Sequence, residues 1–279
     1  MFYGGDVAAV VLCWNDGERV LRLLRGLQAA SPPPGRVIVV DNGSSDGSLA
    51  RLAAAFPELE ILSLDSNLGF AAAANRGMRA ALSAGAGWVW LLNTDLVLPP
   101  DALARLLAAA GSDPRCGMAG AVLTEADGSV QARGGGRWNA WTASLRHAVS
   151  EGDRCDYLSG ACLLLRATML DQCGLFDEDY FFYWEDVELG FRVRERGWTL
   201  AVADDCRVVH VEGSTLGRWS EERWYHLFRG VKRFARARSR LPRVAVGWRL
   251  ARHSATMLRH GRGAAVKGAW RAVAARPPA

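Results

Sequence analysis

An aromatic segment that runs directly into acidic residues is the clearest candidate for a catalytic role in this sequence. Residues 180–184, with the sequence YFFYW, are followed by Glu185, Asp186 and Glu188. A buried strand would leave these acids without partners, and a solvated face would leave a row of aromatic rings in water. We therefore interpret the segment as an aromatic wall that leads into a helix with an acidic first turn. A helix N-terminus stabilises negative charge, so these acids can remain ionised at neutral pH.

Two interpretations of Glu185 and Asp186 are open. A carboxylate on an apolar wall suits a general base that removes the proton from a hydroxyl nucleophile. The alternative is structural, and in it the acids only form the first turn of an ordinary amphipathic helix. Taken alone, the segment favours the structural alternative, so the choice depends on the rest of the chain.

Polar residues follow three short apolar runs elsewhere in the sequence. Residues 7–12, 37–40 and 88–92 have the continuity expected of strands that are buried on both faces. The polar residues that come after them are Trp14-Asn15, Asp41-Asn42 and Asn93-Thr94-Asp95. Loops at the carboxyl ends of parallel strands form the ligand crevice of such sheets. Three polar loops on one rim indicate a ligand rich in hydrogen-bonding groups.

The segments between these runs have the spacing of amphipathic helices. After the first run, apolar side chains recur at helical intervals at Val20, Leu23, Leu24 and Leu27. Further helices are predicted at about 49–56, 71–82 and 99–110, with a short strand at 60–63. Repeated strand–helix units of this size predict a Rossmann-like, doubly wound and mostly parallel α/β sheet.

The second half of the chain has a different pattern. Asp127-Gly128 lies between two strand-like segments and predicts a hairpin. The glycine-rich residues 134–138 are expected to form a flexible loop. The other elements expected here are a strand at 158–165, a helix at 167–172 and strands at 198–203 and 208–210.

The net charge of +5 conceals a strong asymmetry along the chain. Residues 226–279 contain 14 Lys and Arg and no Asp or Glu, so the first 225 residues carry 20 basic and 29 acidic side chains. We expect a domain at 1–225 and a tail of two basic amphipathic helices at 226–279, separated near Pro242. Such a tail is either a solvated extension packed on the domain or a contact to an anionic membrane surface. Nucleic acid is not an expected partner, because the body is acidic and no known binding motif is present.

Bulk properties limit the class of protein. Half of the 279 residues are hydrophobic, which allows a sizeable core. No apolar run has the length of a membrane span, and the N-terminus has no signal-peptide pattern. The six cysteines form no CxxC pair, as expected of reduced thiols. The sequence predicts a cytoplasmic protein, with the basic tail as a candidate peripheral contact to the inner face of the plasma membrane.

Five motifs occur in one order along the chain. They are VVDNGSSDG at 39–47, NLGF at 67–70 with Asn75-Arg76-Gly77, LLNTD at 91–95, WEDVEL at 184–189 with Arg192 and Gly197, and His210 with Gly213-Ser214. Each motif alone is weak, since Asp-Asn-Gly-Ser is also a good turn. Together they resemble the family 2 glycosyltransferases of the GT-A fold, closest to the bacterial rhamnosyltransferase-like branch, over about Val7 to Ser214. The resemblance implies inverting transfer of a sugar from a nucleotide-diphosphate donor to a hydroxyl group.

The resemblance assigns the first polar loops to the donor. Trp14 could stack near the base, and Asp41 or Asn42 could accept hydrogen bonds from the base or from ribose hydroxyls. The structural alternative for Asp41 is a turn that caps the next helix. The full set of residues expected to contact the donor is Trp14, Asn15, Asp41, Asn42, Asn67, Asn75, Asn93, Thr94 and Asp95.

Asp95 is the expected metal ligand, and Mg²⁺ or Mn²⁺ suits its oxygen atoms. A divalent cation between the phosphates would neutralise charge on the leaving nucleotide. Many relatives carry Asp-X-Asp here, whereas this chain has Asn93 at the first position, which supplies no charge and lowers the expected metal affinity. His210 matches a family position that can complete the metal shell, although a lone histidine at a strand end is often only structural.

The resemblance places Asp186 as the general base that takes the proton from the acceptor hydroxyl. A single displacement needs only this base and a stabilised leaving group, and it inverts the anomeric carbon. Glu185 would orient the base or the acceptor. Tyr183, Trp184 and Trp138 are expected to face the acceptor sugar, because aromatic rings suit the apolar face of a pyranose. Core packing is the alternative for Trp184.

Other classes of protein fit less well. A sugar nucleotidyltransferase or a nicotinamide dehydrogenase would need a glycine-rich loop after the first strand, and residues 13–17, CWNDG, do not form one. A catalytically inactive scaffold that binds a nucleotide-sugar or a membrane is the remaining alternative. The predicted function is transfer of a deoxyhexose such as rhamnose to a glycan or lipid-linked acceptor in cell-surface polysaccharide synthesis, with a dTDP- or UDP-linked donor.

Overall fold

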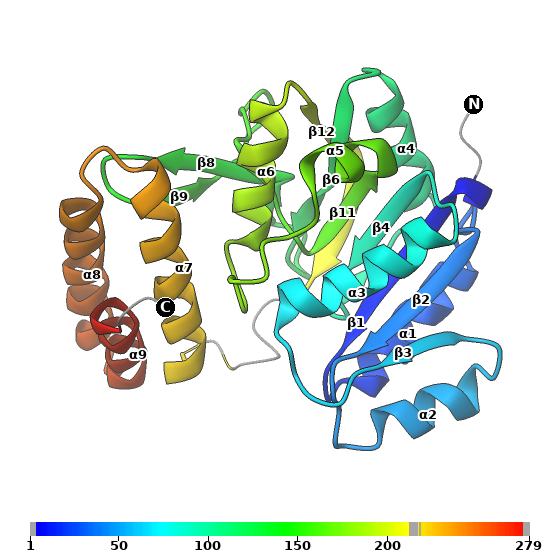
Figure 1. Ribbon diagram of the computed structural model, residues 1–279, viewed down its shortest axis with the longest axis horizontal. Coiled ribbons are helices and arrows are strands. Elements are labelled where there is room, and N and C mark those ends of the chain that lie inside the picture. Colours follow the sequence, from blue (N-terminus) through cyan, green and yellow to red (C-terminus); the bar gives the residue numbers. More distant parts are fainter. Residues whose placement is uncertain (1–3, 212–216, 218, 276–279) are drawn as a thin grey trace.

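A mostly parallel sheet forms the centre of the protein (Figure 1). The computed structural model describes residues 4–211, 217 and 219–275. The sheet has nine strands in the order β3-β2-β1-β4-β11-β6-β12-β5, with β7 paired to β6. Their bounds are β1 Val7–Cys13, β2 Arg36–Asp41, β3 Glu60–Ser63, β4 Trp88–Leu92, β5 Leu96–Val97, β6 Cys116–Thr124, β7 Val130–Arg133, β11 Cys162–Arg166 and β12 Thr199–His210. Strand β1 pairs in parallel with both β2 and β4, so the predicted doubly wound start is confirmed.

Helices cover both faces of the sheet, as the apolar spacing of the sequence predicts. One core layer is formed with α1 Gly17–Gln28, α2 Ser48–Ala55 and α4 Ala102–Gly111. The other is formed with α3 Phe70–Ser83, α5 Ala167–Cys173 and α6 Glu185–Glu195. In the first layer Leu27 and Leu103 are buried in one cluster with Trp90, and in the second Met78 is buried with Val10. A short 3-10 helix, Gly4–Asp6, precedes β1.

The glycine-rich segment is ordered, contrary to the predicted flexible loop. It forms β8 Gly135–Asn139, which pairs with β9 Ser144–His147 and β10 Tyr157–Leu158 in a second, three-stranded sheet. A Cβ atom on Gly135 would lie 2.0 Å from the Tyr157 carbonyl oxygen, and one on Gly136 would lie 2.4 Å from the Arg146 carbonyl oxygen. The glycines therefore permit close approach of neighbouring strands and do not mark a flexible loop.

Two other strand predictions need correction. The predicted strand at 158–165 is divided into β10 and β11, and residues 159–161 connect them. The predicted strands at 198–203 and 208–210 form one strand, β12, with an irregularity between Ala203 and Arg207 that accommodates the acidic residues there. The predicted hairpin is present between β6 and β7, with Gly128 at a φ of +84°.

The basic tail folds into three helices, whereas the sequence predicted two. They are α7 Glu221–Arg238, α8 Pro242–Arg259 and α9 Gly263–Ala274. Pro242 opens α8 as expected, but the break at Gly261, which has a φ of +67°, lies within the predicted second helix. The boundary predicted between residues 225 and 226 falls inside α7. Among the helices of the described residues, none is long and apolar enough to cross a membrane.

The helical extension, defined as α7–α9, packs directly on the aromatic segment. Phe234 of α7 is buried beside Trp184 and Val187, and its ring centroid lies 5.0 Å from that of Trp138. A Cβ atom on Gly230 would lie 2.5 Å from a ring carbon of Trp184, so only glycine permits this approach of α7. The extension therefore holds the residues that precede α6 in place.

Candidate active site

The aromatic segment enters α6 through an unusual backbone. Tyr183 has a φ of +70° and Trp184 a φ of +81°, and neither residue is glycine. Such conformations cost about 1–3 kcal/mol each and persist where surrounding structure enforces them, commonly at functional sites. Trp184 is the N-cap of α6, whose first turn contains Glu185, Asp186 and Glu188. The predicted acidic first turn is thus present, and the strained backbone sets its direction.

The two acids of this turn have different surroundings. Asp186 Oδ2 accepts a hydrogen bond from the Gly160 amide at 2.8 Å, and Asp186 Oδ1 accepts one from the Val187 amide at 2.7 Å. Glu185 is buried, and no group among the described residues hydrogen-bonds to its Oε2. Burial raises the pKa of both carboxyl groups, and the Asp186 charge raises the pKa of Glu185 further. Glu185 therefore holds the proton of the pair, and Asp186 is the carboxylate.

A cavity of about 350 Å³ opens beside these acids. The predicted site residues in its wall are Asn93, Asp95, Tyr183, Trp184, Glu185, Asp186 and His210. The sequence interpretation missed other residues of the wall, among which are Phe70, His147, Tyr157, Arg223 and Arg249. Arg223 and Arg249 belong to α7 and α8, so the helical extension forms part of the cavity that contains Asp186. We call this the catalytic cavity.

A smaller cavity of about 100 Å³ lies at the carboxyl ends of β1, β2 and β4. Six residues expected to contact the donor line it: Trp14, Asn42, Asn67, Asn93, Thr94 and Asp95. Asp16, which the sequence interpretation missed, also lines it and accepts a hydrogen bond from the Thr94 hydroxyl at 2.6 Å. Phe70, Asn93, Asp95 and Phe182 line both cavities. The two spaces therefore meet at Asp95, and we call the smaller one the donor cavity.

The amide side chains on the donor rim shape its loops. Asn42 Nδ2 donates to Asn67 Oδ1 at 3.0 Å, while Asn42 Oδ1 accepts from the Leu68 amide at 2.9 Å. Asp41 is buried behind them, and its Oδ1 has no hydrogen-bond partner among the described residues. Asn15 is exposed, lines neither cavity, and accepts a hydrogen bond from the Ser45 amide at 2.8 Å. Asn15 thus connects two loops of the rim.

Asn75 does not line the donor cavity, so the structure gives no support to its predicted contact with the donor. It is buried on α3, where its Nδ2 donates to the Phe176 carbonyl at 2.9 Å and to Glu178 Oε1 at 2.8 Å. Its Oδ1 accepts from the Phe176 amide at 3.0 Å. With its amide fully used, Asn75 fixes the loop that precedes the aromatic segment.

Trp138 is also outside the catalytic cavity, contrary to its predicted contact with the acceptor. Its ring packs edge to face against Trp184, with centroids 5.5 Å apart. Trp184 is 3% exposed, so core packing dominates its environment even though it borders the cavity. Tyr183 is half-buried and is the aromatic residue of the three that remains suited to an acceptor sugar.

Asp95 and His210 lie together because β12 pairs with β5 at His210 and Leu96. The His210 Nε2 and Asp95 Oδ1 atoms are 3.5 Å apart. Gln131 donates from Nε2 to the His210 carbonyl at 2.6 Å, which directs Gln131 Oε1 toward His210 Nδ1 at 2.9 Å. This pattern assigns the imidazole proton to Nδ1 and leaves the Nε2 lone pair facing the carboxylate.

A lone pair that faces a carboxylate oxygen suits a shared cation, and an outer hydrogen bond to the other ring nitrogen is usual for a metal-binding histidine. Asn93 adds a neutral oxygen on the same walls. The donor set therefore fits one divalent ion. No cluster of three or more His, Cys, Asp or Glu suited to a metal occurs in the described part of the chain. The predicted Gly213-Ser214 motif lies outside the described residues.

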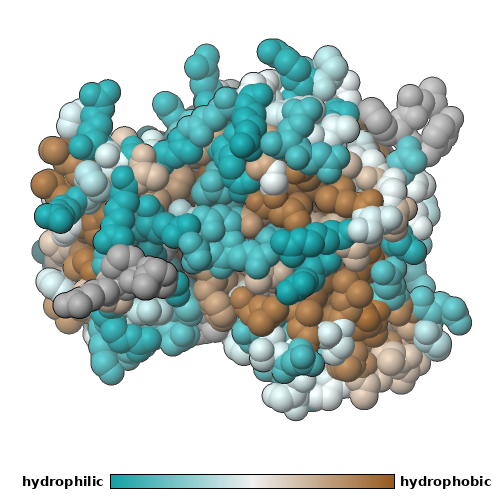
Figure 2. Space-filling view, in the orientation of Figure 1, coloured by the Kyte–Doolittle hydropathy of each residue, from teal (hydrophilic) through white to brown (hydrophobic). Residues whose placement is uncertain are grey.

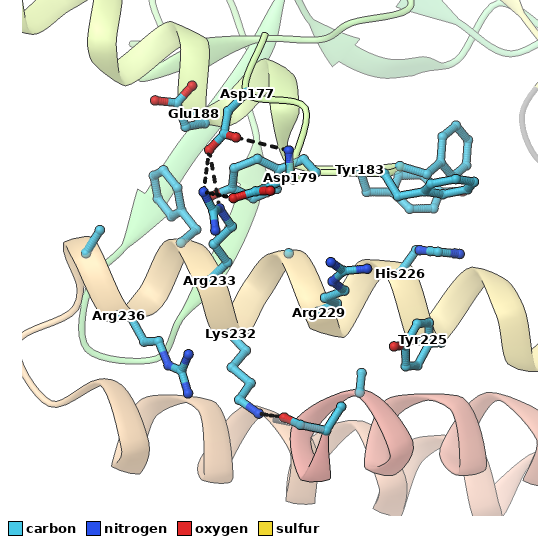
Figure 3. Close-up of a pocket in the computed structure, with 18 of the residues that line it drawn as sticks. Asp177, Asp179, Tyr183, Glu188, Tyr225, His226, Arg229, Lys232, Arg233 and Arg236 are labelled. Atoms are coloured by element: carbon cyan, nitrogen blue, oxygen red, sulfur yellow. Dashed lines mark hydrogen bonds and ion pairs between the residues drawn. The ribbon is translucent and has the colours of Figure 1, made fainter. Parts of the chain in front are cut away.

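A third cavity, of about 710 Å³, lies between α7, α9 and the aromatic segment (Figure 3). Arg233 pairs there with Asp177 at 2.8 Å and with Asp179 at 2.6 Å. Lys232 donates to carbonyl groups at the end of α9 (Figure 3). These charged side chains are thus occupied by partners within the protein. Asp186 does not line this cavity. This cavity is therefore not the chemical site.

A doubly wound sheet with a polar cavity at its strand ends, joined to a cavity that contains a carboxylate, is the arrangement expected of a glycosyltransferase. A model of the family described as "Glycosyltransferase like family 2" matches residues 5–232. The chain belongs to this family. The alternative of an inactive scaffold now means that this particular chain would have the family fold without its transferase activity.

A curated relative agrees with this assignment, and solved structures share the fold. The chain is 34% identical over 241 residues to the N-acetylglucosaminyl-diphospho-decaprenol L-rhamnosyltransferase of Mycobacterium tuberculosis, covering 76% of this chain and 78% of that protein. GalNAc-T7 with UDP, GalNAc and Mn²⁺ has a TM-score of 0.63 at 15% identity, covering 81% of this chain and 47% of that one. A mannosyltransferase from Pyrobaculum calidifontis in complex with GDP-Man and Mn²⁺ has a TM-score of 0.59 at 18% identity, covering 98% and 76%. The predicted GT-A fold is confirmed.

Proposed function

We propose that this protein transfers a deoxyhexose such as rhamnose from a nucleotide-diphosphate donor to a hydroxyl of a glycan or lipid-linked acceptor in cell-surface polysaccharide synthesis. The observation that carries the proposal is the position of Asp186. Its carboxylate lies in a cavity that meets the donor cavity at Asp95. An acceptor hydroxyl can therefore be activated next to the place where the donor sugar is expected.

The proposed chemistry is a single displacement that inverts the anomeric carbon. The Asp186 carboxylate takes the proton of the acceptor hydroxyl while the oxygen attacks the sugar. The Gly160 and Val187 amides stabilise this carboxylate in its charged form. Protonated Glu185 places no second charge beside the base. The bond to the donor diphosphate breaks as the new glycosidic bond forms.

A divalent cation, Mg²⁺ or Mn²⁺, is part of the proposal. Asp95 and His210 would hold it, with Asn93 as a neutral oxygen ligand and Gln131 fixing the imidazole. When bound, such an ion neutralises charge on the leaving nucleoside diphosphate. Two structures with the same fold contain Mn²⁺, which supports the choice of metal.

The identity of the sugar is supported by the mycobacterial relative, whose name gives L-rhamnose as the transferred sugar. The test is a panel of dTDP-, UDP- and GDP-linked sugars with Mn²⁺ and Mg²⁺, read out as release of the nucleoside diphosphate. We expect turnover with dTDP-rhamnose and at least tenfold less with the other donors. Turnover of a UDP-hexose in preference would overturn the rhamnosyl assignment. Nucleotide binding without any turnover would favour the inactive scaffold, for which Asn93 is the residue to explain.

We also propose that the outer face of α8 contacts an anionic membrane, which places the protein at the inner face of the plasma membrane. Leu241, Val244, Trp248 and Leu258 are exposed and recur at helical spacing. The neighbouring charged residues Arg243, Arg252 and Arg259 are all basic. In the space-filling view, hydrophobic residues reach the surface beside hydrophilic ones at this end of the molecule (Figure 2).

Replacing Val244 and Trp248 together by Ser should weaken binding to anionic phospholipid vesicles by about tenfold or more, because burial of such side chains contributes over 1.4 kcal/mol. Vesicle sedimentation at fixed salt measures this. Val149→Ser, at an exposed apolar residue outside the extension, is the control and should bind as the wild type does. Equal binding by all three proteins would exclude this face.

A further inference from the structure

A guanidinium enters the catalytic cavity from the helical extension. Arg249 of α8 lines this cavity, and its Cζ lies over the Trp184 ring at 5.4 Å from the centroid. Its Nη1 donates to the Ala143 carbonyl. Burial lowers the pKa of Arg249 to about 10, so the side chain is still charged at neutral pH.

Arg249 has no carboxylate partner among the residues that the structure describes, which distinguishes it from other partly buried arginines. Arg192 pairs with Glu188 at 2.7 Å and Arg238 with Glu195 at 2.8 Å. Removing a charged group from water costs several kcal/mol unless a counter-ion and hydrogen bonds offset it. One carbonyl and the rings of Trp184 and Phe228 satisfy only part of a guanidinium that has five N–H donors. The remaining donors are available for an anion that enters the cavity.

Two further basic side chains line the same cavity. Arg223 of α7 lies over the Tyr183 ring, 5.3 Å from its centroid. His147, at the end of β9, has its Nδ1 3.5 Å from the Tyr157 hydroxyl. None of the three lines the donor cavity. The basic groups are therefore on the acceptor side, away from the loops expected to hold the nucleotide.

We propose that Arg249, assisted by Arg223, binds a phosphate group of the acceptor, so that the acceptor is a glycosyl diphosphate carried by a lipid. The inference rests on the proposed function and adds the acceptor class and its binding residues. A planar guanidinium matches phosphate oxygens in two parallel hydrogen bonds. The exposed apolar residues of α8 include Trp248, adjacent to Arg249 in sequence, which places a surface suited to a lipid next to the one suited to its phosphate.

The competing explanation is structural. Arg249 also connects α8 to the turn before β9 through Ala143, and it packs on Trp184. A purely structural role predicts that its loss affects every acceptor equally and lowers the melting temperature. A phosphate-binding role predicts a loss that depends on the acceptor charge.

The test compares an alkyl glycosyl diphosphate with the neutral alkyl glycoside of the same sugar. Arg249→Met should raise KM for the diphosphate acceptor by about 10–100-fold, since hydrogen bonds to charged groups contribute about 1.5–3 kcal/mol. KM for the neutral acceptor and for the donor should change less than threefold. The KM of Arg249→Lys for the diphosphate acceptor should lie between those of Arg249→Met and the wild type, because lysine keeps the charge but lacks the paired N–H donors of a guanidinium. Arg236→Met, at an exposed position of α7 outside the catalytic cavity, is the matched control.

A binding measurement keeps this test independent of turnover. Calorimetry with an alkyl diphosphate that carries no sugar, added to protein saturated with nucleoside diphosphate, should show binding that Arg249→Met and Arg223→Met weaken. Equal losses on both acceptors, or alkyl diphosphate binding unchanged in both variants, would overturn the inference while the transferase remains active. A wild-type protein that binds the alkyl diphosphate but transfers to neither acceptor would instead overturn the proposed function.

Discussion

Asp186→Asn is expected to lower kcat/KM for sugar transfer by about 10²–10⁴-fold, the range that general base catalysis contributes. The amide preserves the size of the side chain and can still accept from the Gly160 amide, but it cannot take up a proton at the catalytic pH. Nucleoside diphosphate binding should be unchanged, because Asp186 does not line the donor cavity. Steady-state transfer and calorimetric nucleotide binding, measured on the same preparation, check both parts.

Asp179→Asn is the matched control, since this acid lies in the same loop region but faces the larger cavity, where it pairs with Arg233. It should retain near wild-type kcat/KM. Because the base works as a carboxylate, kcat/KM of the wild type should fall as the pH falls through the Asp186 pKa, which burial raises. Glu185→Gln should leave this acid limb in place, because Glu185 is already neutral where Asp186 titrates. An Asp186→Asn enzyme with wild-type rates would assign the base to another residue.

The sheet and the first helices could be predicted because their signals are local. A strand buried on both faces, such as residues 88–92, must be a continuous apolar run, and a helix over it must show apolar side chains at helical intervals. Glycine is ambiguous in the same kind of analysis. From the sequence alone, Gly135 and Gly136 suggest a flexible loop. In the structure they are required because a side chain at either position would collide with a carbonyl oxygen of the neighbouring strand.

The acceptor side of the site could not be predicted, because it is built from residues far apart in the chain. Arg223 and Arg249 are two of many arginines in the tail, and nothing in their local sequence separates the half-buried Arg249 from the exposed Arg252. Packing of α7 and α8 around Trp184 brings Arg249 to the cavity, and this packing is visible only in the folded protein. Asn75 shows the reverse case, since its amide matches a motif but serves a loop about a hundred residues away.

The extension also changes the meaning of the domain boundary. A basic tail suggests a detachable anchor, whereas α7 carries Gly230 and Phe234 against the aromatic segment and supplies part of the cavity wall. Removal of the tail would therefore expose the Trp184 cluster and open the site. Point substitutions on the outer face of α8 are for this reason a cleaner probe of membrane contact than truncation.

Asp95→Ala is the second change with a large expected effect. Lewis-acid stabilisation by a divalent cation contributes several kcal/mol to such reactions, so loss of its carboxylate ligand should lower transfer by roughly 10³-fold. Chelation of divalent ions should lower wild-type transfer to a similar level, and added Mn²⁺ should restore the wild type but not the variant. Asp205→Ala, at an exposed residue of β12 that pairs with Arg105, is the control and should behave as the wild type does.

The hydrogen bond between Gln131 and His210 allows a second variant with a smaller expected loss of metal affinity. Gln131→Ala should leave both ligands in place but free the imidazole to rotate, and loss of such an outer partner typically costs 10–100-fold in metal affinity. Mn²⁺ affinity, measured by electron paramagnetic resonance with nucleoside diphosphate bound, should therefore fall in the order wild type, Gln131→Ala, Asp95→Ala. Transfer at saturating Mn²⁺ should recover in Gln131→Ala alone of the two variants. If chelation leaves wild-type transfer intact and Gln131→Ala binds Mn²⁺ normally, Asp95 and His210 do not form a metal site, and their approach at the end of β12 only joins the strand to the loop after β4.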